Sequence, residues 1–191
     1  IDDRIVGVEN GVLIKELDNV IGREKTLETI RRIFALGTKY LSKHGLTISV
    51  DDLKVNKKVE DSTDKIIKEA EQKTEEIIDS YYKKTLEIIP GKTREESREI
   101  KIIQTLNEVR AKIGQVVKHE FPKNNPINSM ILSGSGGNIL NITQMACCVG
   151  QQSIGGNRIE MGYTNRTLPF FKEYDLSPRA KGFIKTPFMK G

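Results

Sequence analysis

Two long stretches with apolar residues at helical spacing occupy the middle of the chain, and they limit most strongly what it can fold into. Residues 61–89 and 94–119 each carry apolar side chains at intervals of three and four positions. That spacing places the apolar side chains of each stretch in one stripe along a helix. The two stripes can face each other while the lysine- and glutamate-rich sides face water. The sequence therefore predicts a long antiparallel helical hairpin over residues 56–120.

The connection between these stretches carries its own signals. Pro90 and Gly91 should end the first helix, because neither residue is favoured in a helix interior. Thr93 and Glu96 then form the T-x-x-E pattern of a capping box, which begins the second helix. A turn this short folds the two helices back on each other. Each arm should be roughly 40 Å long at about 1.5 Å per residue.

The segment before the hairpin, residues 1–55, is expected to be part helical and part extended. Its first 22 residues mix β-branched residues with glycines, which predicts a short extended or turn-rich piece. From Arg23 onward apolar residues recur at helical spacing, and Gly45 should end that helix because glycine adopts the left-handed conformation without strain. Residues 46–50 then alternate as a brief strand or an extended link.

Residues 121–191 change character again and predict a small, irregular domain with short strands. After Pro122 and Pro126 the sequence indicates a short apolar element, a glycine turn, and a compact helix from about Asn138 to Val149. That helix is apolar on most sides, which is typical of a buried helix. The last forty residues contain many turn formers and should wrap against something larger. The expected fold class is therefore mainly α (α+β).

Composition excludes several classes of protein. No apolar run approaches the roughly 18 residues that a membrane span needs, and no leader with a cleavage site opens the chain, so a cytoplasmic location is expected. The only two cysteines, Cys147 and Cys148, are adjacent, so they cannot form a disulfide framework or a CxxC zinc site. Buried thiols within a helix are the expected arrangement.

The net charge of +5 is concentrated at one end of the chain. The first 120 residues balance, with 23 basic and 23 acidic side chains, whereas residues 121–191 hold eight basic and three acidic ones. The basic residues there are Lys123, Arg158, Arg166, Lys172, Arg179, Lys181, Lys185 and Lys190, and the acidic ones are Glu160, Glu173 and Asp175. Such an excess suggests contact with nucleic acid or nucleotide phosphates, and a solvated basic surface without a ligand explains it equally well.

No self-contained catalytic or metal site is visible, so we expect no catalytic residue, no metal ligand and no bound cofactor. The cluster Gly134-Ser135-Gly136-Gly137 lacks the GK[ST] ending of a phosphate loop. His44 and His119 lie near the ends of different predicted helices, which gives no zinc spacing. Adjacent carboxylates are explained by helix caps and solvated faces; they occur at Asp2-Asp3, Asp51-Asp52, Glu75-Glu76 and Glu95-Glu96.

The amide pair Gln151-Gln152 follows the predicted buried helix and invites two interpretations. Two neutral amides offer donors and acceptors without charge, which suits a channel lining or a contact with a neighbouring helix. Alternatively they cap the helix and meet water. The residues alone leave both interpretations open.

A resemblance to a known family adds what the chemistry of single residues does not provide. The run NILNITQMACCVGQQSIGGNRI at residues 138–159, followed by GYTNRTLPFFKEYDLSPRAKGFIKTPFMKG at 162–191, closely resembles the largest subunit of multisubunit DNA-directed RNA polymerases. Upstream, TLNEVRAKIG at residues 105–114 is similar to the family's L-N-x-x-R-x-K-x-G helix. The long lysine- and glutamate-rich hairpin is more similar to the archaeal subunit than to a eukaryotic nuclear one.

The resemblance implies a role within a larger enzyme, a nucleotidyltransferase. The hairpin at 56–120 then corresponds to the funnel around the secondary channel, through which nucleoside triphosphates enter and which cleavage-stimulating elongation factors approach. Residues 121–191 correspond to the pore segment that leads to the bridge helix. The NADFDGD loop that binds Mg in the family is absent, so the metal is expected outside this chain, and the chain alone is expected to be an inactive piece of the subunit. Its implied partners are other polymerase subunits, template DNA, RNA and nucleoside triphosphates, without a membrane, in the cytoplasm or, for a eukaryotic source, the nucleus.

The resemblance also assigns individual positions. Asn107 and Arg110 are similar to positions of the helix on the pore side. Positions beside the bridge helix, which form the amatoxin pocket in eukaryotic members, correspond to Gln144, Val149, Gly150, Gln151, Gln152, Ser153, Gly156 and Arg158. These residues would form a bed on which the bridge helix bends. Gly136 stands where many members carry a basic residue, which puts a direct phosphate contact there in doubt. The alternative is a separate helical-hairpin module that binds nucleic acid through residues 121–191.

Overall fold

The computed structural model describes residues 5, 11–122, 124–160 and 162–191, and it divides into two compact units. The first unit comprises the described residues up to Lys54 together with Phe121–Asn138. The second combines Val55–Glu120 with Ile139–Gly191. Most of the regular structure is helical and the strands are short, which confirms the expected mainly α class. In the described parts of the chain, no helix is both long enough and apolar enough to cross a membrane.

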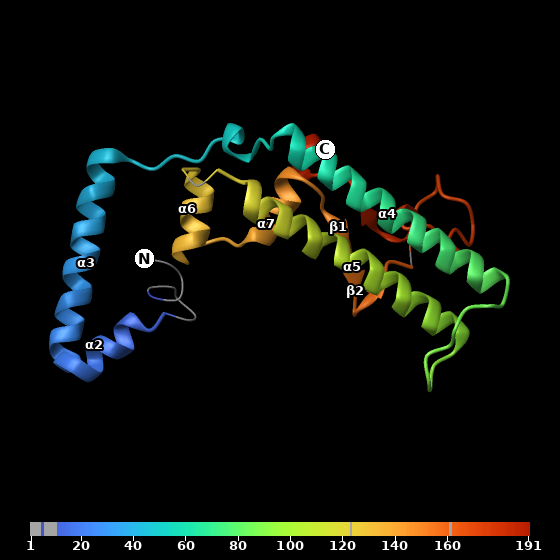
Figure 1. Ribbon diagram of the computed structural model, residues 1–191, viewed down its shortest axis with the longest axis horizontal. Coiled ribbons are helices and arrows are strands. Elements are labelled where there is room, and N and C mark those ends of the chain that lie inside the picture. Colours follow the sequence, from blue (N-terminus) through green and yellow to red (C-terminus); the bar gives the residue numbers. More distant parts are fainter. Residues whose placement is uncertain (1–4, 6–10, 123, 161) are drawn as a thin grey trace. The chain divides into compact units, whose positions relative to one another are not determined.

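The second unit is built on the predicted hairpin. Helix α4 spans Lys57–Tyr82 and helix α5 spans Arg94–Glu120, and the two lie antiparallel, side by side (Figure 1). Their facing stripes are buried and consist of Val59, Ile67 and Ala70 on α4 and of Ile102, Leu106, Val109, Ile113 and Val117 on α5. The capping box at the start of α5 is confirmed: Glu96 N donates to Thr93 Oγ1 at 3.1 Å, and Thr93 N donates to Glu96 Oε2 at 2.9 Å.

Helix α4 ends earlier than the sequence predicts, at Tyr82 rather than near residue 89. Lys84 adopts the left-handed conformation (φ 60°), and the N–H groups of Thr85 and Leu86 both donate to Ser80 O. These bonds close the helix well before Pro90, so the Pro-Gly pair does not break it. Leu86 therefore lies in the connection rather than on the helical stripe, and the link from α4 to α5 is longer than a tight turn.

The first unit contains a helix where the sequence suggested an extended piece. Residues Leu13–Ile21 form α2 and Arg23–His44 form α3, with Gly22 (φ 80°) between them. The expectation for residues 1–22 is therefore wrong over α2, where apolar residues also recur at helical spacing, while residues 1–4 and 6–10 lie outside the described residues. Gly45 ends α3 as predicted, with φ 70° and its N–H donating to Leu41 O.

Short elements complete the first unit. Residues 46–49 form no strand, and a 3-10 turn, η1, follows at Val50–Leu53. Helix α6 spans Pro126–Ser133 and is capped by Asn125, whose side-chain oxygen accepts from Ile127 N at 2.9 Å. The same Asn125 side chain donates to Asp52 O at 2.6 Å and so ties α6 to the segment after α3.

In the second unit the helix predicted as buried is shorter than expected, and of its residues only Ile142, Thr143 and Ala146 are buried. Helix α7 spans Ile139–Ala146, because the N–H groups of Cys147 and Cys148 both donate to Thr143 O and close its last turn. The two thiols are buried, as expected, but they lie beyond the helix rather than within it.

Two small antiparallel sheets follow α7. Strand β1 (Gly150–Gln151) pairs with β4 (Phe183–Ile184), and β2 (Ser153–Ile154) pairs with β3 (Asn157–Arg158). Two 3-10 turns flank β4, namely η2 at Arg179–Lys181 and η3 at Phe188–Lys190.

Candidate functional site

The glutamine pair is divided between the interior and the surface. Gln151 is buried, and its Nε2 donates to Lys181 O at 2.8 Å and to Gln152 O at 2.6 Å. Gln152 is half-buried, and its N–H donates to Gly182 O at 2.9 Å. Gln151 thus neither caps α7 nor meets water. It fastens β1 to the chain just before β4, and Gln152 is the member of the pair that a neighbour can reach.

A close approach at Gly182 makes this fastening possible. Gly182 has φ 90°, and a Cβ built on it would lie 2.9 Å from Ile159 Cδ1 and 3.4 Å from Gln151 Nε2. Real Cβ atoms are not found at the first distance, and L-residues rarely adopt this φ. Glycine is therefore required where these three residues meet.

The turn that leaves α7 brings four of the assigned residues together. Gln144, on α7, donates from Nε2 to Val149 O at 3.3 Å, and the buried Val149 donates from its N–H to Thr186 O at 3.2 Å. Gly150 follows with φ 83°, where a Cβ would lie 3.8 Å from Arg110 Cβ. Arg110, on α5, is thus next to the turn. Asn107, one turn earlier on α5, is exposed.

Strands β2 and β3 form a hairpin that presents its tip to solvent. Gly155 (φ 58°) and Gly156 (φ 82°) form a two-residue turn with both φ values positive, a conformation that glycine adopts without strain. Ser153 and Gly156 are exposed, and the Ile154 side chain is 72% exposed. The hairpin therefore offers an apolar tip beside a flat glycine turn.

Arg158, the last residue of β3, anchors this hairpin in the interior. Its side chain is fully buried, and its Nε and Nη2 donate to the two carboxylate oxygens of Glu99 at 2.8 and 3.0 Å. Its Nη1 donates to Leu176 O at 3.1 Å. A bidentate pair of this kind fixes orientation as well as position. Arg158 therefore fastens the hairpin to α5 rather than facing the surface.

Glu99 is shared by several cations. Arg98 donates to Glu99 Oε1 at 2.8 Å and lies 4.3 Å above the Tyr81 ring, while Lys181 Nζ lies 3.9 Å from the same oxygen. Burial alone would raise the pKa of Glu99, but hydrogen bonds and charges from Arg158, Lys181 and Arg98 outweigh it and hold that pKa below its usual value. Glu99 therefore remains ionised at neutral pH.

The two thiols are not poised for reaction. Burial raises the pKa of Cys148 to about 11, and burial also raises the pKa of Cys147. Cys148 Sγ donates to Ile184 O at 3.3 Å, which links it to β4. Since the thiolate is the nucleophile, both cysteines are packing residues at neutral pH.

Metal binding finds no support in the residues that the structure describes. In that part of the chain, no group of three or more His, Cys, Asp or Glu side chains could hold a metal ion. Position 136 does not require glycine, because a Cβ there would meet only Met130 Cε at 3.7 Å. A basic side chain could therefore stand at that position without strain.

Sequence reasoning missed Glu99, Ile159, Lys181 and Gly182. For Glu99 a signal was available: it lies three residues before Ile102 and seven before Leu106, so it shares their stripe on α5. A charged residue in a buried stripe needs a partner. The partner, Arg158, is 59 positions away, and nothing in the local sequence identifies it.

Comparison with known proteins places these features in a family. Residues 77–184 match the family model described as RNA polymerase Rpb1, domain 4. The chain is 36% identical over its whole length to the DNA-directed RNA polymerase subunit Rpo1N of Halococcus morrhuae, of which it covers 55%. It is also similar over its whole length to the Rpo1N subunits of Methanocaldococcus jannaschii (36% identical, 14% of that chain) and Thermococcus celer (37%, 21%). The chain thus spans about half, or less, of the length of these relatives.

Proposed function

Because the chain belongs to the RNA polymerase Rpb1, domain 4, family, we propose that it acts as part of the largest subunit of a DNA-directed RNA polymerase, in the Rpo1N type. The α4–α5 hairpin is proposed to form the funnel wall of the secondary channel, where nucleoside triphosphates enter. The segment from Gln144 to Arg158 is proposed to support the bridge helix. Nucleotidyl transfer belongs to the assembled enzyme, and this chain contributes shape and contacts, with no step through a metal at the described residues.

The observation that carries this proposal is the exposed β2–β3 tip on a buried anchor. Ser153, Ile154 and Gly156 are exposed, whereas Arg158 is held by Glu99 inside the unit. A tip fixed in this way can support a neighbouring element that moves, because it does not have to be ordered when contact is made. Gln152 adds an amide beside the tip, Arg110 of α5 lies next to Gly150 at the start of β1, and Asn107 of α5 is exposed.

Proposed partners follow from the same arrangement. The other polymerase subunits, DNA, RNA and the nucleotides meet this chain in the assembled enzyme, and a cleavage-stimulating elongation factor approaches the α4–α5 hairpin. The connection at residues 83–93 is mostly exposed and carries three basic side chains and one acidic one, namely Lys83, Lys84, Lys92 and Glu87, with Lys83 Nζ lying 3.9 Å from Asp79 Oδ2. An acidic surface on such a factor would complement it.

The second candidate function, nucleic-acid binding by residues 121–191, receives less support. Four of the basic residues in the described part of this segment are paired with carboxylates: Arg158 with Glu99, Lys181 with Glu160, Lys185 with Glu71, and Lys190 with Glu60. These pairs reduce the positive charge that is available along the segment for contacts with the phosphates of a strand.

A reconstituted polymerase carrying this chain tests the main proposal. Ile154→Ser changes a side chain that is 72% exposed, and Ile88→Ser changes an isoleucine that is 46% exposed, in the connection before α5. We expect Ile154→Ser, and to a smaller degree Gln152→Ala, to slow elongation about severalfold while assembly stays normal, because a lost apolar contact costs roughly 1 kcal/mol or more. Ile88→Ser should elongate like the unmodified enzyme. Equal rates for all three variants would contradict the role proposed for the tip.

A further inference from the structure

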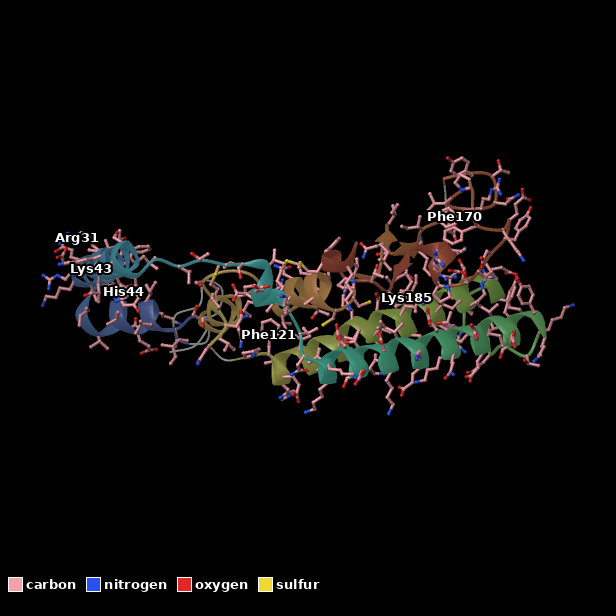
Figure 2. The ribbon with its side chains drawn as sticks, turned by 90° about the horizontal axis from the view of Figure 1, so that it is seen from above. Arg31, Lys43, His44, Phe121, Phe170 and Lys185 are labelled. Carbon is pink, nitrogen blue, oxygen red and sulfur yellow. The ribbon has the colours of Figure 1, made fainter. Side chains whose placement is uncertain are left out.

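A cleft of about 380 Å³ lies where the end of α4 and the start of α5 meet the segment from Glu160 to Lys181. This volume falls within the range of small-molecule sites, roughly 300–1,000 Å³. One side of the cleft belongs to a loop that stands away from α4 and α5, with Phe170 on it (Figure 2). The cleft is separate from the β2–β3 tip, which contributes no residue to its lining.

Positive charge dominates the lining of this cleft. Four basic residues, Arg98, Arg166, Lys172 and Lys181, face two acidic ones, Glu160 and Asp175. Arg98 and Lys181 are already paired with carboxylates, as described above. Within the part of the chain that the structure describes, Arg166 and Lys172 form no ion pair. Two cations in the cleft are thus left without a counterion.

Arg166 is held in place without being neutralised. Its Nη1 donates to Pro169 O at 3.2 Å and to Phe171 O at 3.4 Å, and both acceptors are uncharged carbonyl groups. Its Nε is buried and, among the described residues, donates to no acceptor. A buried donor on a charged group costs free energy unless an acceptor reaches it. An anion would supply both an acceptor for Nε and a counterion for the guanidinium group.

The opposing acid does not fill this role, and aromatic rings line the rest of the cleft. Asp175 uses Oδ1 to accept from Ser177 N at 2.8 Å, which keeps it in its own turn. Tyr82 and Tyr174 are 63% and 68% exposed, so their faces are accessible to a ligand. Accessible rings offer a stacking surface for a planar apolar group.

We propose that this cleft binds a small organic phosphate with an aromatic ring, its anionic group at Arg166 and Lys172 and its ring against Tyr82 or Tyr174. This site is separate from the β2–β3 tip proposed to support the bridge helix, and its ligand does not bind the tip. The phosphate supplies the missing acceptor and counterion, while the ring covers apolar surface that the fold leaves open.

Calorimetric titration of the full chain with three probes tests the proposal. AMP carries both the ring and the phosphate, adenosine lacks the phosphate, and ribose 5-phosphate lacks the ring. We expect AMP to bind saturably, and each of the other two to bind about tenfold more weakly, because a charged hydrogen bond or a stacked ring contributes on this scale. Adenosine binding as tightly as AMP, or no saturable AMP binding, would overturn the proposal. Ribose 5-phosphate binding as tightly as AMP would overturn the aromatic part.

Substitutions of single residues test whether AMP binds in the cleft. Arg166→Gln and Lys172→Gln should each raise the Kd for AMP about tenfold. Among the described residues the Lys172 side chain makes no hydrogen bond or ion pair, so its variant remains informative if Arg166→Gln loosens the loop. The control is Lys185→Gln, which removes an exposed cation of the same unit, outside the cleft lining and away from Phe170 (Figure 2). An equal loss of affinity in the control, or unchanged affinity in Lys172→Gln, would contradict the assignment.

Discussion

Helices α3 and α5 have the same kind of sequence pattern but differ in burial. Both are long, at 22 and 27 residues, and both carry an apolar stripe at helical spacing. In α5 eight residues are buried, whereas in α3 only Thr26 is. Phe34 and Leu36 of α3 are 73% and 70% exposed, while Leu106 of α5 is inaccessible to solvent.

The contrast separates what periodicity determines from what it leaves open. Spacing specifies that a helix forms and which of its faces is apolar. It does not specify the partner, and the partner supplies most of the stabilisation. The stripe of α5 is covered by α4 on one side and by α7 and β1 on another, whereas much of the stripe of α3 stays exposed.

Truncating one apolar side chain in each helix tests the contrast most strongly. Leu106→Ala should lower the free energy of unfolding by about 2–5 kcal/mol, because it leaves a cavity in a closed core. Phe34→Ala should change it by about 0.5 kcal/mol or less, because the ring is already in water. Urea unfolding followed by circular dichroism measures both. Equal losses of unfolding free energy in the two variants would contradict the contrast between α3 and α5, because they would show that Phe34 is packed.

A second test compares two carboxylates with similar hydrogen bonds and different burial. Glu99→Gln leaves the buried Arg158 without a full counter-charge and should cost about 1–3 kcal/mol of unfolding free energy. Glu28, on α3, accepts from Arg31 at 2.8 Å and from Arg32 at 2.9 Å, but all three side chains are exposed. Glu28→Gln should therefore leave urea unfolding unchanged, because water screens such pairs. A comparable loss in both variants would show that burial is not the deciding difference.

The smallest expected effect is a dependence on pH. The folded state holds the pKa of Glu99 below its ordinary value of 4.5, so the folded protein binds fewer protons than the unfolded chain between the two pKa values. The stabilisation is fully present above pH 4.5 and is lost as pH falls toward the folded pKa. The difference in unfolding free energy between the unmodified protein and Glu99→Gln should thus narrow as pH is lowered. A constant difference would contradict the ionised state of Glu99.

The sequence predictions for the two hairpin helices succeeded where the residues that bond to each other are close in sequence and match a known pattern. The start of α5 could be predicted because Thr93 and Glu96 bond to each other across three positions. The end of α4 could not, since the apolar spacing continues through Leu86 while backbone bonds to Ser80 O close the helix first.

The candidate site shows the same limit. The burial of Gln151 depends on a carbonyl of Lys181, 30 positions later, and that of Arg158 depends on Glu99, 59 positions earlier. The β2–β3 turn is different, because its Gly155-Gly156 pair is a local hairpin signal that was available and was not used. Family resemblance assigned positions in this segment without indicating which of its side chains point inward.

Gly182 has a consequence for how this segment can evolve. Its missing side chain is the space that Ile159 and the Gln151 amide occupy. A smaller residue at position 159 would relieve only that contact, because φ at Gly182 is 90° and strains any L-residue there whatever the space. We therefore expect glycine to persist at position 182 in descendants of this sequence, while position 159 can vary among apolar residues.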